Sequence, residues 1–325
     1  SDVKTYIGSA GQFTATAAQA ISAGDAVAMD STGKVGPIKQ IQGLWNNTDG
    51  DRNYDFGAAS EDEYVSEGFA TAYDPDTDRH LIVWKNAAYD VWSVVVARNA
   101  GNADATFGTP VQIHNSTGTS DRAKGISCTY DTSADRFLVM YNVNDNSTAY
   151  NNTIKGRVAT VTGGSTNSVA FGTVTTILDH GLIFGQMSPC TTYATSANRH
   201  VVVNRIYRLN SDSSVQDYEW SSLTVEVTGG GTNTPSAGTY AQVSSGNYGD
   251  AESESICWDE TNDRFIAIHM DNNTDDWMHA VGSISGSTIT WGAVAVFDNT
   301  NSSYSGAGSA CIHDASTNRT AVFIS

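Results

Sequence analysis

The sequence is poor in charge, in cysteine and in long apolar runs. Charged residues make up 16% of its 325 positions, against about a quarter in an ordinary soluble domain. No apolar run approaches the roughly 20 residues of a membrane helix, so no membrane insertion is expected. The first residues, SDVKTYIGSAGQF, contain no signal-peptide core, and we expect synthesis in a cytoplasm without export.

Positive charge is the scarcest kind. The chain has 17 Lys and Arg against 35 Asp and Glu, which gives a formal net charge of −18. Phosphate backbones are bound by clustered cations, so no nucleic-acid partner is expected. The surplus of carboxylates favours solubility and repels anionic surfaces.

The sequence is rich in Thr, Val, Ser, Gly, Asn and Tyr, a composition typical of strands and turns. One phrase recurs five times: an aromatic residue and Asp, a polar run, an arginine and then apolar residues, as in CTYDTSADRFLVMY. The repeated arginines are Arg79, Arg136, Arg199, Arg264 and Arg319. Their separations of 57, 63, 65 and 55 residues indicate a repeat architecture.

A second marker keeps step with the arginines. An aromatic residue followed by glycine occurs at Phe56, Phe107, Phe171 and Trp291, and Tyr240 in AGTYAQV is interpreted as a degraded copy. Two markers that advance together indicate that the whole segment between them repeats.

Each repeat resolves into four strands. In the second repeat, residues 125–130 form the first strand, DTSADR is a hairpin turn, and residues 137–142, 155–162 and 169–178 form the others. Four antiparallel strands repeated radially are the plan of a β-propeller. The arginine is then expected to bind turn carbonyls or the Asp. A cluster of arginines that binds a carboxylate, as in sialidase propellers, is the alternative.

Four repeats are complete in the sequence. The fifth supplies two strands, and residues 39–45 and 53–60 offer the two that it lacks. The sequence therefore predicts an all-β fold: a propeller of five four-stranded blades over residues 38–325, closed by N- and C-terminal strands. A fragment of a longer array, cut within a blade, is the alternative. Residues 1–37 are interpreted as a small N-terminal β segment used for attachment.

The four cysteines are Cys128, Cys190, Cys257 and Cys311. Each lies seven to nine residues before a repeated arginine, which we interpret as equivalent positions, one whole repeat apart. They are expected to be small buried hydrophobic residues, with disulfides or metal ligation as the alternative. No C-x-x-C spacing supports a zinc site.

Two stretches resemble a known family. ISAGDAVAMDSTGKV resembles the N-terminal attachment segments of tailed-phage fibre and virion surface proteins. YDPDTDRHLIVW and YDTSADRFLVMY are similar to the propeller-type repeats of marine phage tail fibres and related virion proteins. The resemblance covers essentially the whole chain and implies a virion protein. Ala194 stands where the motif has Asp, the third repeat lacks a clear Phe-Gly pair, and the motif marks no catalytic residue.

No pattern of metal-binding or catalytic residues stands out. The run DPDTD at 74–78 begins like a calcium loop, but an EF-hand loop needs Gly and Glu where this chain has Arg79 and Lys85. The acidic clusters at 61–63 and 250–254 are expected to be solvated loops. We expect neither a metal nor a cofactor. A glycosidase-type enzyme stays open, because paired carboxylates from different blades leave no local motif.

The longest loops join strands two and three, or lead from strand four to the next repeat, and both kinds are expected on one face. Aromatic residues with Asn and Asp suit sugar rings through stacking and hydroxyl hydrogen bonds, and packing of the loops is the competing explanation. The candidate binding residues are Tyr89, Tyr150, Tyr207, Trp277 and Tyr304, with His180 in a long loop.

These features predict a non-enzymatic structural protein of a bacteriophage virion, a tail fibre or spike that presents a propeller for host attachment. Its expected partners are a receptor or glycan of the host surface and, through residues 1–37, other virion proteins. A homo-oligomer such as a trimer is also expected. The alternatives are a carbohydrate-active propeller enzyme and a purely structural capsid decoration or tail connector.

Overall fold

The computed structural model describes strands and turns, and no helix occurs in the described part of the chain. Among these residues, accordingly, none belongs to a helix long and apolar enough to cross a membrane. The described residues are 2–7, 11–16, 27–29, 35–37, 68–86, 88–98, 105–118, 121–145, 152–163, 167–179, 189–209, 215–228, 233–244, 254–271, 274, 276–299 and 309–324.

The chain divides into two compact units, residues 1–54 with 98–105, and residues 55–97 with 106–325. In the smaller unit, two antiparallel pairs are described. They are β1 (Asp2–Ile7) with β2 (Gly11–Thr16), and β3 (Val27–Met29) with β4 (Val35–Pro37). The sequence around Ser31-Thr32-Gly33 favours a turn between two strands, and β3 and β4 flank it.

Five antiparallel sheets follow in chain order, and all their residues except Arg98 and Ala105 belong to the larger unit. The first has β5 (Phe69–Asp74), β6 (Arg79–Lys85), β7 (Val91–Arg98), β8 (Ala105–Phe107) and β9 (Val111–His114). The second has β10 (Asp121–Asp131), β11 (Arg136–Asp145), β12 (Asn152–Thr162), β13 (Ser168–Phe171) and β14 (Thr175–Asp179). The third has β15 (Cys190–Ala194), β16 (Arg199–Leu209), β17 (Val215–Thr228) and β18 (Thr234–Ser244). The fourth has β19 (Ser255–Asp259), β20 (Arg264–Asp271), β21 (Asp276–Ser285), β22 (Thr288–Trp291) and β23 (Ala295–Asp298), and the fifth has β24 (Ser309–Asp314) and β25 (Arg319–Ile324).

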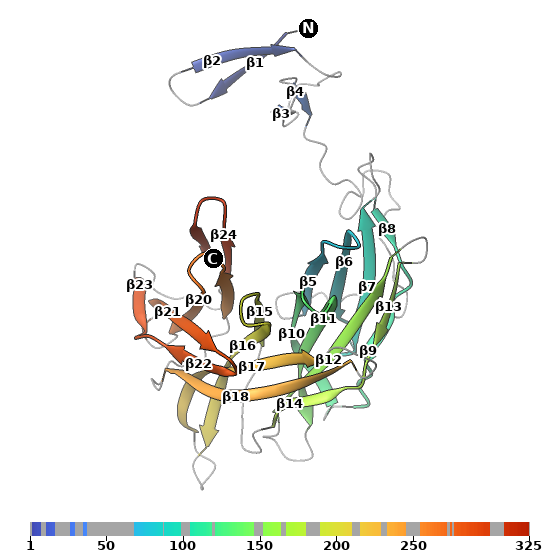
Figure 1. Ribbon diagram of the computed structural model, residues 1–325, viewed down its shortest axis with the longest axis vertical. Coiled ribbons are helices and arrows are strands. Elements are labelled where there is room, and N and C mark those ends of the chain that lie inside the picture. The colour runs from blue at the N-terminus through green and yellow to red at the C-terminus, as the bar shows by residue number, and fades with distance from the viewer. Residues whose placement is uncertain are drawn as a thin grey trace. The chain divides into compact units, whose positions relative to one another are not determined.

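The sheets repeat as the arginine spacing predicts. Within the first four, strands one to four pair in chain order, and β9, β14 and β23 pair back with the third strand, beside the short β8, β13 and β22. The first strands of successive sheets lie side by side in the order β5, β10, β15, β19 and β24 (Figure 1). Four-stranded antiparallel sheets arranged through their first strands are typical of β-propellers. The fold is therefore all-β and propeller-like. The strands predicted at 39–45 and 53–60, and the predicted boundary after residue 37, lie outside the described residues.

The aromatic-glycine marker is the place where the fourth strand breaks. In the second sheet β13 ends at Phe171 and β14 resumes at Thr175, yet both pair with β12. The first and fourth sheets break in the same way, and β18 of the third sheet runs unbroken. Ala237 stands opposite Val225 there, as Phe171 stands opposite Ala159. The interpretation of Tyr240 as the marker is therefore wrong.

A tight turn explains the recurring Asp, polar run and arginine. Each first strand ends at the motif Asp, or at Ala194 in the third sheet, and each second strand begins at the arginine, as predicted. In the second sheet the Asp131 carboxylate accepts hydrogen bonds from the N–H groups of Ser133 and Ala134, both at 2.9 Å. The residue before each arginine is Asp or Asn with a φ of 52–53°, a left-handed conformation that these two side chains tolerate.

Successive sheets pack through side chains that alternate along the second strand. Counted from the repeated arginine, residues at even offsets face the following sheet, and residues at odd offsets face the preceding one. At the first junction Leu81 and Val83, at offsets two and four, are fully buried in one cluster with Val139, at offset three of the next sheet. The same core sharing recurs for Leu138 with Val202, Val201 with Phe265, and Ile268 with Val322. Each buried side chain of this size contributes roughly 1.5–3 kcal/mol.

A polar clasp crosses the first two junctions. Arg79 Nε donates to Oδ1 of Asn167 at 2.7 Å, and Arg136 Nε donates to Oδ1 of Asn233 at 3.1 Å. Both asparagines belong to the following sheet, where they precede the fourth strand with a φ of 41°. A Cβ on Gly172 would lie inside van der Waals contact of the Asn233 carbonyl oxygen. The arginine and the marker glycine of one sheet thus lie against the same asparagine of the following sheet. The expected bonds from arginine to turn carbonyls are also present, as in Arg136 Nη1 to the Asp135 oxygen at 2.7 Å.

The four cysteines do not all occupy equivalent positions. Cys128 and Cys311 stand opposite the third residue after the arginine, Cys257 opposite the second and Cys190 opposite the fourth. Because a difference of one residue reverses the face of a strand, Cys190 and Cys257 face the following sheet, whereas Cys128 and Cys311 face the preceding one. The expectation of equivalence is therefore wrong. The expectation of buried thiols is confirmed for Cys128 and Cys257, and the other two are half-buried.

Replacing Gly172 by alanine tests the clasp. The new Cβ must push away the Asn233 carbonyl, so Gly172→Ala should destabilise the protein by about 1–3 kcal/mol in chemical denaturation. Gly118→Ala is the matched control, because nothing lies within 4 Å of a Cβ added there. The control should change the stability by less than about 0.5 kcal/mol. Equal losses for the two variants would contradict the role of Gly172.

Candidate functional site

Each sheet has a turn end and a loop end. In the second sheet the register brings Asp131, Arg136, Ala159 and Phe171 to the turn end, which carries the connections between strands one and two and between strands three and four. The connections from strand two to three, and from strand four to the next sheet, leave from the loop end. This confirms the prediction that both kinds of loop share one face.

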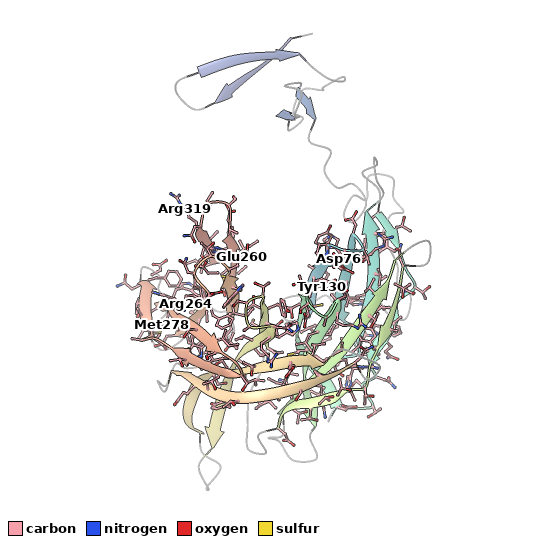
Figure 2. The ribbon with its side chains drawn as sticks, in the orientation of Figure 1. Asp76, Tyr130, Glu260, Arg264, Met278 and Arg319 are labelled. Carbon is pink, nitrogen blue, oxygen red and sulfur yellow. The ribbon has the colours of Figure 1, made fainter. Side chains whose placement is uncertain are left out.

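Polar side chains join neighbouring turns at the turn end. Figure 2 shows Tyr130, from β10, close to Asp76 in the turn before β6. The Tyr130 hydroxyl donates to Oδ2 of Asp76 at 3.5 Å and to Oδ1 of Asp135 at 3.4 Å. The hydrogen bond with Asp135 raises the pKa of Asp76, because two meeting carboxyl groups favour a shared proton. Burial, together with the neighbouring carboxylates, raises the pKa of Tyr130, so its hydroxyl stays a donor.

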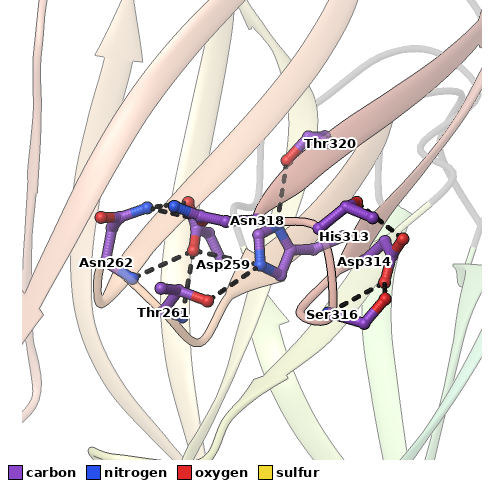
Figure 3. A network of polar contacts seen from close by, with 9 residues as sticks. Asp259, Thr261, Asn262, His313, Asp314, Ser316, Asn318 and Thr320 are labelled. Atoms are coloured by element: carbon purple, nitrogen blue, oxygen red, sulfur yellow. Dashed lines mark hydrogen bonds and ion pairs between the residues drawn. The ribbon is translucent and has the colours of Figure 1, made fainter.

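The fourth junction has its own polar network (Figure 3). His313 Nε2 lies 3.3 Å from Oδ1 of Asp259 in the preceding sheet. Asn262 Nδ2 donates to Oδ1 of Asn318 at 3.1 Å, again from one sheet to the next. These groups lie in the turns between strands one and two or at the ends of the first strands, so the turn end is occupied by contacts within the fold.

The DPDTD run at 74–78 belongs to this structural network. Asp74 Oδ1 accepts hydrogen bonds from the N–H groups of Asp76, at 2.9 Å, and Thr77, at 3.2 Å. Asp74 therefore closes its own turn, while Asp76 reaches Tyr130 of the next sheet. Within the described residues, no group of three or more His, Cys, Asp or Glu side chains is placed to hold a metal ion.

A buried histidine lies at the second junction. His200 is fully buried, with Nδ1 2.8 Å from the Thr129 hydroxyl and Nε2 3.7 Å from Oδ2 of Asp131. Burial lowers the pKa of His200 to about 4, although the charge of Asp131 acts in the opposite direction. The neutral imidazole is therefore the form that fits this junction. Phe137 and Phe265 stand at the same offset in the neighbouring sheets.

The loop end of the first sheet holds an aromatic residue in a strained conformation. Tyr89 has a φ of 66°, which costs on the order of 1–3 kcal/mol for a residue with a Cβ. The nearly buried side chain of Asn86 fixes the loop, because its Oδ1 accepts hydrogen bonds from the N–H groups of Ala88, at 3.0 Å, and Asp90, at 2.9 Å. The Tyr89 N–H donates to the Asn86 carbonyl at 2.9 Å. The strained residue is thus held in a short loop by three hydrogen bonds that Asn86 accepts.

Two cations lie against the ring of Tyr89. Lys85 Nζ is 5.1 Å and Arg122 Cζ 4.4 Å from the ring centroid, distances at which the quadrupole of the ring attracts a cation. Lys85 ends β6 and Arg122 lies near the start of β10, so the three residues come from two neighbouring sheets. The Ala123 N–H donates to the Tyr89 carbonyl at 3.2 Å and ties the loop to the second sheet. We call Lys85, Tyr89 and Arg122 the Tyr89 cluster.

The carboxylates near the Tyr89 cluster are bound to other groups. Asp90 Oδ1 accepts a hydrogen bond from the Ser116 N–H at 2.7 Å, and Asp121 Oδ1 lies 3.4 Å from Nε2 of His114. Among the residues that the structure describes, Arg122 has no carboxylate partner. A phenol hydroxyl and a guanidinium with unused donors therefore lie together at the loop end, where they can bind hydroxyl or carboxyl groups.

Of the six predicted binding residues, Tyr89 lies at the loop end as expected. Tyr207 was predicted in a loop, but β16 runs on to Leu209 and pairs Tyr207 with Tyr218. Its side chain lies outside the described part of the structure, as do Tyr150, Tyr304 and His180.

The prediction for Trp277 is wrong. β21 begins at Asp276, so Trp277 is a strand residue, and its side chain is 1% exposed. It packs with Ile268 and Met270 against the fifth sheet. The polar run MDNNTDDW, residues 270–277, predicts a loop that ends two residues later than the observed one, because β21 already begins at Asp276. Alternation along the strand directs the indole into the core.

The sequence reasoning missed Lys85 and Arg122. Each stands at the end of a strand, one just before a loop and one just after another loop. Their separation of 37 residues gives no local pattern. Only the pairing of neighbouring sheets brings the two cations to one tyrosine.

His200 should make stability depend on pH. Between about pH 6.5 and 4 the unfolded histidine binds a proton that the folded one does not, so stability falls as the pH is lowered. His200→Phe removes this effect. From pH 7 to 4.5, the unmodified protein should lose roughly 1–3 kcal/mol more than the variant in urea denaturation. Parallel losses in the two proteins would show that another group titrates.

No family model matches the chain, and no curated protein matches it in sequence. Among solved structures, an N-acetylgalactosamine deacetylase from F. plautii, in complex with blood group B trisaccharide, is similar at 10% identity and a TM-score of 0.43, over 79% of this chain and 78% of that chain. AofleA from Arthrobotrys oligospora is similar at 9% identity and a TM-score of 0.37, over 80% of this chain and 79% of that one. A prolyl endopeptidase is similar at 14% identity and a TM-score of 0.33, over 79% of this chain and 35% of that one. Each likeness concerns the arrangement of strands, and none assigns an activity to this chain.

Proposed function

We propose that the protein is a non-enzymatic component of a tailed-phage virion, a tail fibre or spike, whose loop end binds a glycan of the host surface. The observation that carries the proposal is the Tyr89 cluster, in which a strained aromatic residue is held against two cations from neighbouring sheets. Strained residues persist where the surrounding structure over-determines them, and they cluster at ligand-binding and switch sites.

The chemistry of the Tyr89 cluster suits an uncharged sugar. The Tyr89 hydroxyl and the Arg122 guanidinium supply donors for sugar hydroxyls, and the accessible edge of the half-buried Tyr89 ring can contact the C–H groups of a sugar ring. The net charge of −18 opposes a polyanionic glycan, since repulsion between charges acts over about 8 Å at physiological salt. A neutral or weakly charged polysaccharide is therefore the ligand that we propose.

Residues 1–37 provide the attachment to other virion proteins in this proposal. Support comes from the resemblance of residues 21–35 to phage attachment segments and from the β3–β4 pair that this stretch forms. A homo-trimer would present three loop ends to one surface, and such multivalency raises avidity without any new contact.

The binding test uses immobilised bacterial surface polysaccharides, neutral and acidic, with the full chain in solution. A neutral polysaccharide should retain the protein, and Tyr89→Ala or Arg122→Ala should each weaken retention about tenfold, the loss of roughly 1.4 kcal/mol. Arg264→Ala is the matched control, because it removes an arginine from the turn end and should bind like the unmodified protein. Absence of binding to every polysaccharide, or unchanged binding by both loop-end variants, would overturn the proposal.

The array of sheets is proposed to close into five blades. Two sheet faces lack a covering sheet in the described structure. On the odd face of the first sheet Phe69 is 46% and Tyr73 44% exposed, and on the even face of the fifth sheet Ile312 is 61% and Phe323 62% exposed. At the four observed junctions an even face packs on the odd face of the next sheet. The even face of the fifth sheet and the odd face of the first sheet could therefore pack on each other in the same way.

A pair of introduced cysteines tests closure. Ile312 stands opposite the second residue after Arg319, and Thr71 opposite the third residue after Arg79, so a junction between them would bring the two side chains together. Thr71→Cys with Ile312→Cys should give, after mild oxidation, a disulfide within one chain, identified by peptide mapping.

The same experiment separates the alternatives to closure. A link between two chains would show a head-to-tail array, and no link would show that the first and fifth sheets stay apart. Either result would refute closure. The single variants, which cannot form the 71–312 link within one chain, are the controls.

A further inference from the structure

We propose that Cys257 and Cys311 form a reversible disulfide that locks the fifth sheet to the fourth. The inference does not depend on the proposed glycan binding. It rests on the register of the strands, which brings the two thiols to facing sides of one junction.

The two cysteines face each other because one stands opposite an even offset of its second strand and the other opposite an odd offset. Cys257, in β19, stands opposite Ile266, the second residue after Arg264, and therefore faces the following sheet. Cys311, in β24, stands opposite the third residue after its arginine and faces the preceding sheet. The strands β19 and β24 lie side by side. Cys311 Sγ is 3.7 Å from the carbonyl oxygen of Ile266, the cross-strand partner of Cys257.

The other two cysteines lack a thiol opposite them. Cys190 faces the fourth sheet, where its Sγ donates to the Glu254 carbonyl at 2.7 Å. Cys128 faces the first sheet, where its core neighbours include Leu81 and Ala72. Among the described residues, the fourth junction is thus the one at which both facing positions are cysteine.

The environments of the two thiols give them different roles. Cys311 is half-buried, so a small reagent can reach it, whereas Cys257 is 6% exposed. The hydrogen bond with Cys311 and burial raise the pKa of Cys257, which keeps it protonated in the reduced protein. Cys311 is therefore the thiol that reacts first, and Cys257 the one that completes the disulfide.

The oxidant is a small-molecule disulfide such as oxidised glutathione. The Cys311 thiolate attacks one of its sulfurs, forms a mixed disulfide and expels one small thiolate. Cys257 then loses its proton and attacks the Cys311 sulfur, which expels the second thiolate. One protein S–S bond replaces two S–H bonds, the two electrons reduce the small disulfide to two thiols, and the reaction reverses in a reducing cytoplasm.

The disulfide would act where the fold has the least support. In the described structure the fifth sheet consists of β24 and β25, with one observed junction, to the fourth sheet. The two cysteines are 54 residues apart in the sequence, so the bond closes a long loop and restricts the unfolded chain. A protein made in a reducing cytoplasm would gain this lock on reaching an oxidising medium.

Thiol counting and peptide mapping of the full chain test the proposal. After incubation with oxidised glutathione, the denatured protein should show two free thiols instead of four, with Cys257 and Cys311 in one linked peptide and Cys128 and Cys190 alkylated. Dithiothreitol should restore four thiols. The oxidised protein should unfold a few degrees higher than the reduced one. Four free thiols after oxidation, a different linked pair, or an unchanged midpoint would overturn the inference.

Two serine variants sharpen the result. Cys311→Ser should abolish the linked peptide and the shift in midpoint, whereas Cys190→Ser should leave both unchanged. The mapping of the unmodified protein decides the matter even where a variant fails to fold. A linked peptide that persists in Cys311→Ser would contradict the assignment.

Discussion

The fold depends on one contact: the even face of each sheet packs on the odd face of the next. A four-stranded sheet has two apolar faces and covers neither alone, as in other repeat proteins where neighbours complete the core. Leu81 of the first sheet is buried against Val139 of the second, and Val201 of the third shares a core with Phe265 of the fourth. The repeated arginine, the marker glycine and the turn asparagines all lie along these junctions. The recurring motif of Asp, polar run, arginine and apolar residues therefore reflects a contact between sheets that repeats, as well as a strand pair that repeats.

What is local in this arrangement could be predicted from the sequence. In the first, second and fourth sheets the Asp of the turn accepts hydrogen bonds from the N–H groups two and three residues on. The left-handed residue of every turn directly precedes the arginine, so both features leave a pattern of fixed spacing. The limits of the strands and the assignment of faces could not be predicted in the same way. The start of β21 decides whether Trp277 lies in a loop or in the core, and the register of β19 decides which neighbouring sheet Cys257 faces. Small errors in either reverse the expected environment, because side chains alternate between the two faces of a strand. Ala237 carries no aromatic signal, and only its register with Val225 shows that it replaces the marker phenylalanine.

The candidate site illustrates the same limit. Tyr89 stands out in the sequence as an aromatic residue in a loop, yet its conformation depends on Asn86 and its charged neighbours come from two sheets. The cluster exists because the end of β6 and the start of β10 reach the same end of a junction. Loop ends of successive sheets meet by the same geometry that joins their turn ends. At the turn ends the polar groups of neighbouring sheets bind one another, as the Tyr130 hydroxyl binds Asp76. The contrast between occupied turn ends and the available donors of Arg122 is what favours the loop end as the binding surface.

The junctions differ in their polar chemistry while their apolar alternation stays the same. The first two use the clasp of arginine and asparagine. At the third, Arg199 turns to Glu226 of its own sheet at 3.2 Å, and Thr224 instead donates across the junction to the Ser287 carbonyl at 3.1 Å. The fourth has the network around His313 and the facing cysteines. Three polar arrangements over four junctions with one packing rule indicate that apolar burial sets the geometry of each junction and that the polar groups adapt to it. Polar side chains that do not set the geometry of a junction can be replaced by others without loss of the fold. At the fourth junction the side chains that face each other are two cysteines, and we propose that these can form a disulfide.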